Sequence, residues 1–150
     1  MMTIRNVDVD GYFSISEVVD GWWGGRRVAH LLPRLFFEHF QDASYVIEVD
    51  GCLSAFLVGF ISPSRQGEAY IHFVGVDPKH RMNSLARNLY ETFFARAKEL
   101  ECTLVRSITS PENHQSIAFH RRMGFTDVVA SSYAGKGIDR VLFTKDISSL

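Results

Sequence analysis

The sequence predicts a mixed α/β fold, with a central, mostly antiparallel sheet that contains one parallel pair of strands and has helices on both faces. Two apolar runs joined by Asp50-Gly51 indicate a β-hairpin, because this pair tolerates the positive φ of a tight turn. An amphipathic segment over residues 84–99 separates two further apolar runs, as in a crossover between parallel strands. No repeat or linker divides the chain, so we expect a single domain over residues 1–150.

The first half of the chain predicts a strand, two helices and an antiparallel meander. A short strand is expected over residues 3–7. Apolar residues at helical spacing predict helix over residues 13–39, and the GWWGG segment divides it into two short helices. The runs SYVIEV, LSAFLVGFI and AYIHFVGV then predict three successive antiparallel strands.

The second half predicts two helices and three strands. In the segment 84–99, the apolar residues that repeat every four positions are Leu85, Leu89, Phe93 and Ala97. The run TLVRSI predicts a strand parallel to the strand before this helix. The next helix is expected to start with a cap over residues 110–112 and to end at Gly124. Two final strands, 126–133 and 139–146, are expected around a Gly135-Lys136-Gly137 turn.

Charge and composition exclude several classes of protein. Sixteen Lys and Arg residues against seventeen Asp and Glu give a net charge of −1, which lacks the basic excess of a nonspecific DNA- or RNA-binding protein. Cys52 and Cys102 are too few for a disulfide framework or a four-ligand metal site, so no metal is expected. We find no signal-peptide pattern and no apolar run near the ~20 residues that span a bilayer. The expectation is a cytoplasmic protein without membrane contact.

One segment, VDPKHRMNSLAR over residues 76–87, indicates an anion site. An apolar strand stops at an Asp-Pro turn, a basic stretch follows, and a helix begins on small residues. The first four N–H groups of a helix have no internal partner and carry about half a positive charge, and small side chains let a ligand approach them. Lys79, His80, Arg81 and Arg87 add cations, so the turn suits a pyrophosphate. The alternative is that these are solvated surface charges and Ser84 only caps the helix.

Two motifs together resemble a known family. Arg81-x-x-Ser84-x-Ala86 resembles the pyrophosphate-binding signature of the GNAT superfamily of acyl-CoA-dependent N-acetyltransferases, a Gln or Arg followed by x-x-Gly-x-Gly or Ala. The segment 113–125, with its asparagine, small residue, aromatic and terminal Gly-Phe, is similar to the family's second motif. The chain departs from the pattern at Ser84, where the family usually has glycine. We expect Ser84 to weaken or alter cofactor binding without abolishing it.

The resemblance implies a fold and a cofactor. It implies a GNAT-like acyltransferase fold in which the parallel strands that end at Val76 and near Ile108 splay apart and hold the pantetheine of acetyl-CoA between them. Backbone groups near Val74 and Val76 would bind that arm, and one N–H would polarise the thioester carbonyl. The cofactor-binding residues that the resemblance implies are Val74, Val76, Arg81, Met82, Asn83, Ser84, Leu85, Ala86, Arg87, Asn113, Ser116, Phe119 and His120.

The implied reaction needs a base for the amine and an acid for the leaving sulfur. His120 is the expected acid, because it stands where relatives carry tyrosine or histidine and because Asn113, Ser116 and His120 share one helical stripe. A histidine near its ordinary pKa of ~6.5 is partly protonated at neutral pH. The alternative is a solvated surface position. For the base we expect His72 ahead of Glu68, with a water chain, a buried structural histidine and an exposed glutamate as alternatives.

The acceptor is expected to be an amine of a small molecule or a peptide. Trp22 and Trp23, beside Gly24-Gly25, offer aromatic surface for it, and Tyr133 lies on the late hairpin. Core packing is the alternative for a tryptophan. A noncatalytic acyl-CoA-binding module is the alternative function, and the resemblance leaves a homodimer open. A dinucleotide-binding domain is disfavoured, because GxGxxG is absent.

Overall fold

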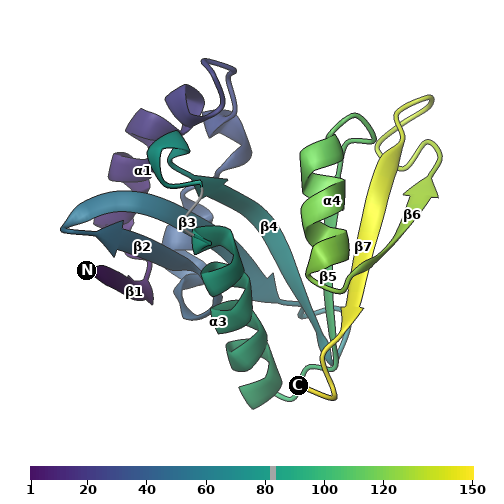
Figure 1. Ribbon diagram of the computed structural model, residues 1–150. Helices are drawn as coiled ribbons and strands as arrows, with labels where there is room; N and C mark the ends of the chain where they lie inside the picture. Colours follow the sequence, from purple (N-terminus) through teal and green to yellow (C-terminus); the bar gives the residue numbers. More distant parts are fainter. Residues whose placement is uncertain (82–83) are drawn as a thin grey trace. The chain divides into compact units, whose positions relative to one another are not determined.

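The computed structural model describes residues 1–81 and 84–150 of the chain (Figure 1). This part of the chain forms two compact units. Unit 1 comprises Met1–Phe60 and Ile71–Arg96, and unit 2 comprises Ile61–Tyr70 and Ala97–Leu150. The elements in chain order are β1 (Met2–Asn6), α1 (Val9–Trp22), η1 (Ala29–Leu31), α2 (Leu35–His39), η2 (Gln41–Ala43), β2 (Tyr45–Val49), β3 (Cys52–Ile61), β4 (Glu68–Val76), η3 (Pro78–His80), α3 (Leu85–Glu99), β5 (Leu104–Thr109), α4 (His114–Arg122), β6 (Thr126–Ala130) and β7 (Arg140–Asp146).

The strands follow the order β1-β2-β3-β4-β5-β7-β6, which confirms the predicted mixed sheet. In unit 1, β1 pairs antiparallel with β2, and β2 pairs antiparallel with β3. The turn between β2 and β3 is the expected hairpin, with φ of 51° at Asp50 and 80° at Gly51. At the end of β4, the N–H of Asp77 donates to the carbonyl of Ser54 on β3 over 2.8 Å. Unit 1 therefore contains the predicted meander.

Helices cover the strands of unit 1. The carboxylate of Asp8 accepts from the N–H of Gly11 over 2.7 Å and caps α1, so this helix starts earlier than expected and is 14 residues long rather than short. Its buried residues, Ile15, Val19 and Trp22, share one face and pack with Phe36, Phe37, Val46, Phe56 and Val58. The α3 helix buries the predicted apolar stripe. Figure 1 shows α3 and α1 on opposite faces of the strands of unit 1.

Unit 2 contains the parallel pair that the sequence predicts. Glu68, Ala69 and Tyr70 of β4 align with Leu104, Val105 and Arg106 of β5 in parallel register. The β5 strand also pairs antiparallel with β7, and β7 with the edge strand β6. The α4 helix packs on this layer through its buried His120.

The start of α4 differs from the prediction. The helix begins at His114, and its N-cap is Asn113, whose side-chain oxygen accepts from the N–H of Ser116 over 3.2 Å. Ser110 instead uses its hydroxyl locally, in a hydrogen bond to the carboxylate of Glu112. Two potential caps stand three residues apart, and the one nearer the helix is used. Gly124, with φ of 89°, ends the helix as expected.

The single domain over residues 1–150 stays a prediction from the sequence. Within the described residues, no helix is both long enough and apolar enough to cross a membrane.

Candidate functional site

The turn after β4 is the part of unit 1 that the sequence predicts to bind a pyrophosphate. Here the carboxylate of Asp77 accepts from the N–H of Lys79 over 2.9 Å and caps the short helix η3. Together with the bond from Asp77 to Ser54, this fixes the direction in which the chain leaves the sheet. Two predicted cofactor residues of the turn, Met82 and Asn83, lie outside the described residues.

Ser84 adopts a left-handed backbone conformation, with φ of 57°. A residue with a Cβ is disfavoured there by about 1–2 kcal/mol, whereas glycine adopts it readily. The carbonyl of Ser84 accepts from the N–H of Asn88 over 3.1 Å and starts α3. The position where the family motif has glycine therefore has the conformation that favours glycine. The serine makes this backbone conformation less favourable, but Ser84 still adopts it. The next two residues start α3, with Leu85 buried and Ala86 half-buried.

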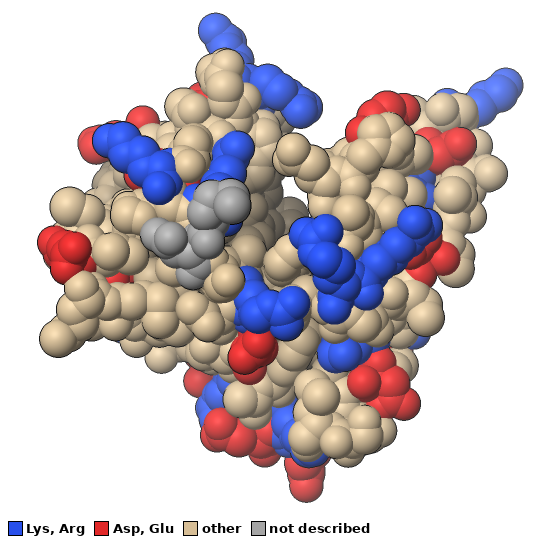
Figure 2. All heavy atoms as spheres, in the orientation of Figure 1, with Lys and Arg blue, Asp and Glu red and all other residues tan. Residues whose placement is uncertain are grey.

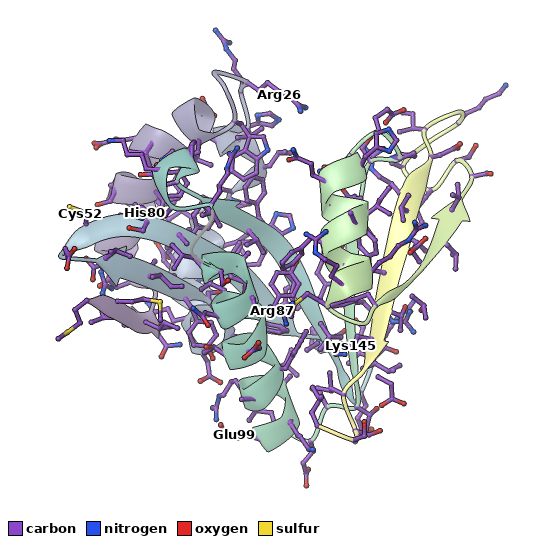
Figure 3. The ribbon with its side chains drawn as sticks, in the orientation of Figure 1. Arg26, Cys52, His80, Arg87, Glu99 and Lys145 are labelled. Carbon is purple, nitrogen blue, oxygen red and sulfur yellow. The ribbon has the colours of Figure 1, made fainter. Side chains whose placement is uncertain are left out.

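Arg81 is anchored to the end of α1. Its Nη2 donates to the carbonyl oxygen of Trp22 over 2.7 Å. Trp22 is the last residue of α1, and the final carbonyls of a helix lack partners within it, so Arg81 satisfies one of them. The exposed Arg87 lies 3.8 Å from Glu91 on α3. Figure 3 labels His80 in the turn before α3 and Arg87 on α3, and Figure 2 shows Lys and Arg side chains on this surface of unit 1.

The backbone of β4 is closely covered by aromatic rings at Gly75. A Cβ at this position would lie 2.5 Å from Cε1 of Phe56 and 3.0 Å from Cζ3 of Trp23. Gly75 was not among the predicted site residues, although a glycine within a strand is a known sign of close approach. Its neighbours Val74 and Val76 are half-buried and lie beyond the described β4–β5 pairing, which ends at Tyr70. Their edge of the strand is thus not used in that pairing.

His72 is exposed, which contradicts the alternative of a buried structural histidine. Its ring stacks on Phe36, with 4.8 Å between centroids and 11° between planes. Its Nε2 lies 2.7 Å from the carbonyl oxygen of Leu31. A carbonyl only accepts, so Nε2 carries the proton of the neutral ring and Nδ1 carries a lone pair. This arrangement leaves a defined nitrogen that can take a proton.

Glu68 is held in an ion pair in unit 2, which contradicts the alternative of an exposed glutamate. Its Oε1 accepts from Nε of Arg106 over 2.5 Å, and only 18% of the Glu68 side chain is exposed. Arg106 also donates to the hydroxyl of Thr144 over 3.0 Å. The parallel register places Arg106 beside the start of β4, and the resulting pair occupies the carboxylate.

The predicted stripe on α4 is a connected chain of hydrogen bonds. Asn113 accepts from the N–H of Ser116 and donates through Nδ2 to the hydroxyl of Thr109 over 3.2 Å. The carbonyl of Ser116 accepts from Nδ1 of His120 over 2.7 Å, and the Ser116 hydroxyl lies 3.3 Å from the same nitrogen. Phe119 is half-buried and meets His120 edge to face. The structure thus brings these four predicted residues together.

His120 is neutral at pH 7, which contradicts the expected partial protonation. Its side chain lies flat on Phe143, with 3.9 Å between centroids and 3° between planes, and the residue is only 5% exposed. This burial lowers the pKa of His120 to about 4, although the hydrogen bond to Ser116 opposes the shift. The single ring proton lies on Nδ1, because a carbonyl accepts from it.

The predicted substrate-binding aromatics have different surroundings. Trp22 is 8% exposed and stacks on Phe56 at 6.0 Å, so its ring belongs to the core instead of to a loop surface. Trp23 is only half-buried and packs on Phe73 at 5.1 Å. In unit 2, Tyr133 is 54% exposed. Burial, together with the nearby Tyr133, raises the pKa of Tyr70 to about 12.

Among residues 1–81 and 84–150, no group of three or more His, Cys, Asp and Glu side chains could hold a metal ion.

Comparison with known proteins places this geometry in a family. The profile of the acetyltransferase (GNAT) family matches residues 14–125. An L-2,4-diaminobutyric acid acetyltransferase from Vibrio parahaemolyticus is 27% identical over 85 residues, which are 57% of this chain and 47% of that protein. The chain thus spans about half the length of this curated relative.

Solved structures share the fold. A putative GNAT-family acetyltransferase from Desulfovibrio desulfuricans matches with a TM-score of 0.85 and 18% identity, covering 99% of this chain and 100% of that one. A putative acetyltransferase from Salmonella typhimurium, solved with its cofactor acetyl-CoA, matches with a TM-score of 0.75 and 19% identity over 99% of this chain and 95% of the other. Because the family profile matches residues 14–125, three quarters of the sequence, the chain belongs to the acetyltransferase (GNAT) family.

Proposed function

We propose that this chain is an acetyl-CoA-dependent N-acetyltransferase that acts on the primary amine of a small molecule. The observation that carries the proposal is the turn from β4 to α3, where Arg81 is anchored and Ser84 holds the glycine-like conformation at the start of a 15-residue helix. Unpaired N–H groups and guanidinium groups at such a point favour bound phosphate. Family membership supports the proposal, and the Vibrio relative is named for a small amine acceptor.

The described residues fit acetyl-CoA. The diphosphate would lie at Ser84, Leu85, Ala86 and Arg87, with Arg81 beside them. The backbone of Val74 and Val76 would bind the pantetheine arm, because that part of β4 lies beyond the pairing with β5. The bound cofactor supplies a thioester whose C–S bond breaks as the amine nitrogen forms a bond to the acetyl carbon.

His72 is the proposed base. It lies two residues before Val74 on β4, so both side chains leave the same face of the strand, about 7 Å apart along it. Because Nε2 donates to Leu31, the Nδ1 lone pair is oriented by the protein and can take the proton that the amine loses. Glu68 keeps only an electrostatic role in this proposal, because Arg106 occupies its carboxylate.

The cofactor role of Asn113, Ser116, Phe119 and His120, which lie in unit 2, stays a prediction from the family resemblance. His120 is neutral, and its ring proton is engaged with Ser116, so delivery of a proton to sulfur is not its favoured role. A thiol has a pKa near ~8.5, so sulfur leaves as a thiolate with little need of an acid. His120 then acts as a positioning residue, through the hydrogen bonds that order α4.

The experiment that tests the function measures thiol release from acetyl-CoA with a panel of small amines and amino-terminal peptides. We expect amine-dependent release, and a rate about a hundredfold or more lower in His72→Phe, which keeps the ring stack on Phe36 but has no nitrogen. His39→Gln, which changes another exposed histidine of unit 1, should leave the rate unchanged. Release that is independent of every amine would overturn the proposal.

A noncatalytic acyl-CoA-binding module is the second candidate. The observations that favour it are the engagement of Glu68 by Arg106 and the neutral state of His120, since neither group supplies free acid or base chemistry. Binding of coenzyme A without transfer to any amine is the outcome that distinguishes it. We favour the enzyme over the binding module because the hydrogen bond to Leu31 orients Nδ1 of His72 to accept a proton.

The cellular setting belongs to the proposal as well. We place the protein in the cytoplasm, a reducing compartment, because both cysteines are free, Cys52 exposed and Cys102 buried. A homodimer would find exposed apolar side chains at Val128 and Val129 on the edge strand β6. Light scattering of the purified protein tests that assembly.

A further inference from the structure

The loop after α1 is held closed by one carboxylate. Oδ1 of Asp20 accepts from the N–H of Val28 over 2.7 Å and from the N–H of Ala29 over 2.8 Å. These two backbone bonds lower the pKa of Asp20, so the group is ionised at neutral pH. Gly25 also donates to the carbonyl of Asp20 over 2.8 Å. These hydrogen bonds hold the two ends of the loop together at Asp20 and give the loop a defined conformation within unit 1.

The outer part of this loop presents two arginines. Gly24 and Gly25 have φ of 67° and 89°, and a Cβ added at either would meet no heavy atom within 4 Å. Arg26 and Arg27 follow directly and are both exposed. Figure 3 labels Arg26 on this loop, where its side chain extends outward, and Figure 2 shows cationic side chains standing out there.

These two side chains differ from the other arginines of unit 1. Ion pairs with carboxylates engage Arg5, Arg34, Arg87 and Arg96, and Arg81 bonds the Trp22 carbonyl. The ion pairs of the described residues include neither Arg26 nor Arg27, and Arg27 acts on Asp20 through space. Asp20 carries one negative charge and hydrogen-bonds the backbone of Val28 and Ala29, so it leaves a net positive charge at the two arginines.

The loop emerges beside the segment of β4 that carries the proposed chemistry. The N–H of Arg26 donates to the carbonyl of Trp23 over 3.3 Å. The Trp23 ring packs on Phe73 and over Gly75, which stand on either side of Val74, and His72 precedes Phe73. The Phe73 ring lies 5.1 Å from the Trp23 ring and 6.4 Å from the His72 ring, so these aromatic rings form a continuous series within unit 1 from the loop to the proposed base.

We propose that Arg26 and Arg27 bind a carboxylate of the acceptor, so that the substrate is an amine that also carries a carboxylate. This rests on the proposed function. The planar guanidinium groups match a carboxylate by paired hydrogen bonds, and the rings of Trp23 and Phe73 suit the carbon chain between the two ends. In this arrangement the amine end of the acceptor would lie toward His72, whose ring is 6.4 Å from that of Phe73.

The test compares matched acceptors. It measures kcat/KM for ω-amino carboxylic acids of increasing chain length and for their methyl esters, which keep the amine and lose the negative charge. We expect the acids to be favoured about tenfold or more, because the esters lose the charge-assisted hydrogen bonds to the guanidinium groups. In Arg26→Gln/Arg27→Gln the preference should fall to within about threefold, with KM for acetyl-CoA and kcat/KM for the esters unchanged.

The control variant removes two positive charges elsewhere. Arg65→Gln/Lys98→Gln changes two exposed cations of unit 2, and it should keep the full preference for the acids. Equal kcat/KM for acid and ester in the wild type, or a preference that survives in Arg26→Gln/Arg27→Gln, overturns the inference and leaves the proposed function standing. A rise in KM for acetyl-CoA in that variant assigns the arginines to the cofactor and also overturns it. Absence of transfer to every amine removes the proposed function and this inference together.

Discussion

The guanidinium of Arg81 donates to the carbonyl oxygen of Trp22 over 2.7 Å, so the turn that precedes α3 is joined to the last residue of α1. One side chain thus serves the proposed phosphate site and the loop that carries Trp23, Arg26 and Arg27. Loss of Arg81 is expected to affect both.

Arg81→Lys tests this double role. Lysine keeps the charge, but its ammonium lacks the planar fork with which arginine contacts a carbonyl and a phosphate at once. We expect the Kd for coenzyme A, measured by calorimetry, to rise about tenfold. Arg65→Lys, at an exposed position of unit 2, is the matched control and should bind as the wild type does. Equal affinity of the two variants would remove Arg81 from the cofactor site.

Ser84→Gly is expected to stabilise the protein. Glycine relieves the backbone strain at φ of 57°, but it also loses more chain entropy on folding. The net gain in the free energy of unfolding should be about 0.5–1 kcal/mol, measured by urea unfolding. The affinity for coenzyme A should rise as well, because the Cβ no longer narrows the approach to the helix start. Glu101→Gly, which relieves a φ of 66° elsewhere, should stabilise without altering that affinity. An unchanged or weaker affinity in Ser84→Gly would contradict this view of the turn.

His120 should make the stability of the protein depend on pH. The folded pKa of about 4 lies below the unfolded value, so the unfolded chain binds more protons between about pH 6.5 and 4. Stability is therefore fully present above pH 6.5 and is lost as the pH falls through this window, by up to about 3 kcal/mol. His120→Phe keeps a ring against Phe143 and should lose less stability between pH 7.5 and 4.5 in denaturant titrations.

The same variant tests the positioning role of His120. We expect His120→Phe to keep kcat within a few-fold while KM for acetyl-CoA rises, because the bond to Ser116 is lost. A loss of kcat of a hundredfold or more, with KM unchanged, would restore the acid role.

Gly75→Ala is expected to destabilise unit 1 by about 1–3 kcal/mol, as overpacking does. The new Cβ would lie 2.5 Å from Phe56, and the rings of Phe56 and Trp23 would have to move. Urea unfolding and tryptophan fluorescence measure both effects. Gly21→Ala, in α1 with no heavy atom within 4 Å of its Cβ, is the control and should stabilise slightly. Similar stability for both variants would argue against tight packing at Gly75.

Local signals explain which parts of the fold could be predicted. The Asp50-Gly51 hairpin and the apolar stripe of α3 follow from residues close in sequence, and the parallel β4–β5 pair follows from the crossover between them. The predicted start of α4 was wrong because Ser110 and Asn113 are both good N-cap residues. The choice between them depends on the hydrogen bonds that each side chain forms locally.

The candidate site was less predictable, because distant residues set its chemistry. Phe143 lies 23 positions after His120, yet its ring buries the imidazole and lowers the pKa. Arg106 engages Glu68 only through the parallel register. The two tryptophans are adjacent in sequence, but one ends a helix in the core and the other begins the loop.

The most direct test of the account follows acetyl transfer itself, by mass spectrometry of the amine product formed by the wild type and by His72→Phe. We predict an N-acetylated amine from the wild type, in amounts equal to the free coenzyme A released, and almost none from the variant. If coenzyme A binds but no amine is acetylated, the result would contradict the account and indicate a noncatalytic binding protein.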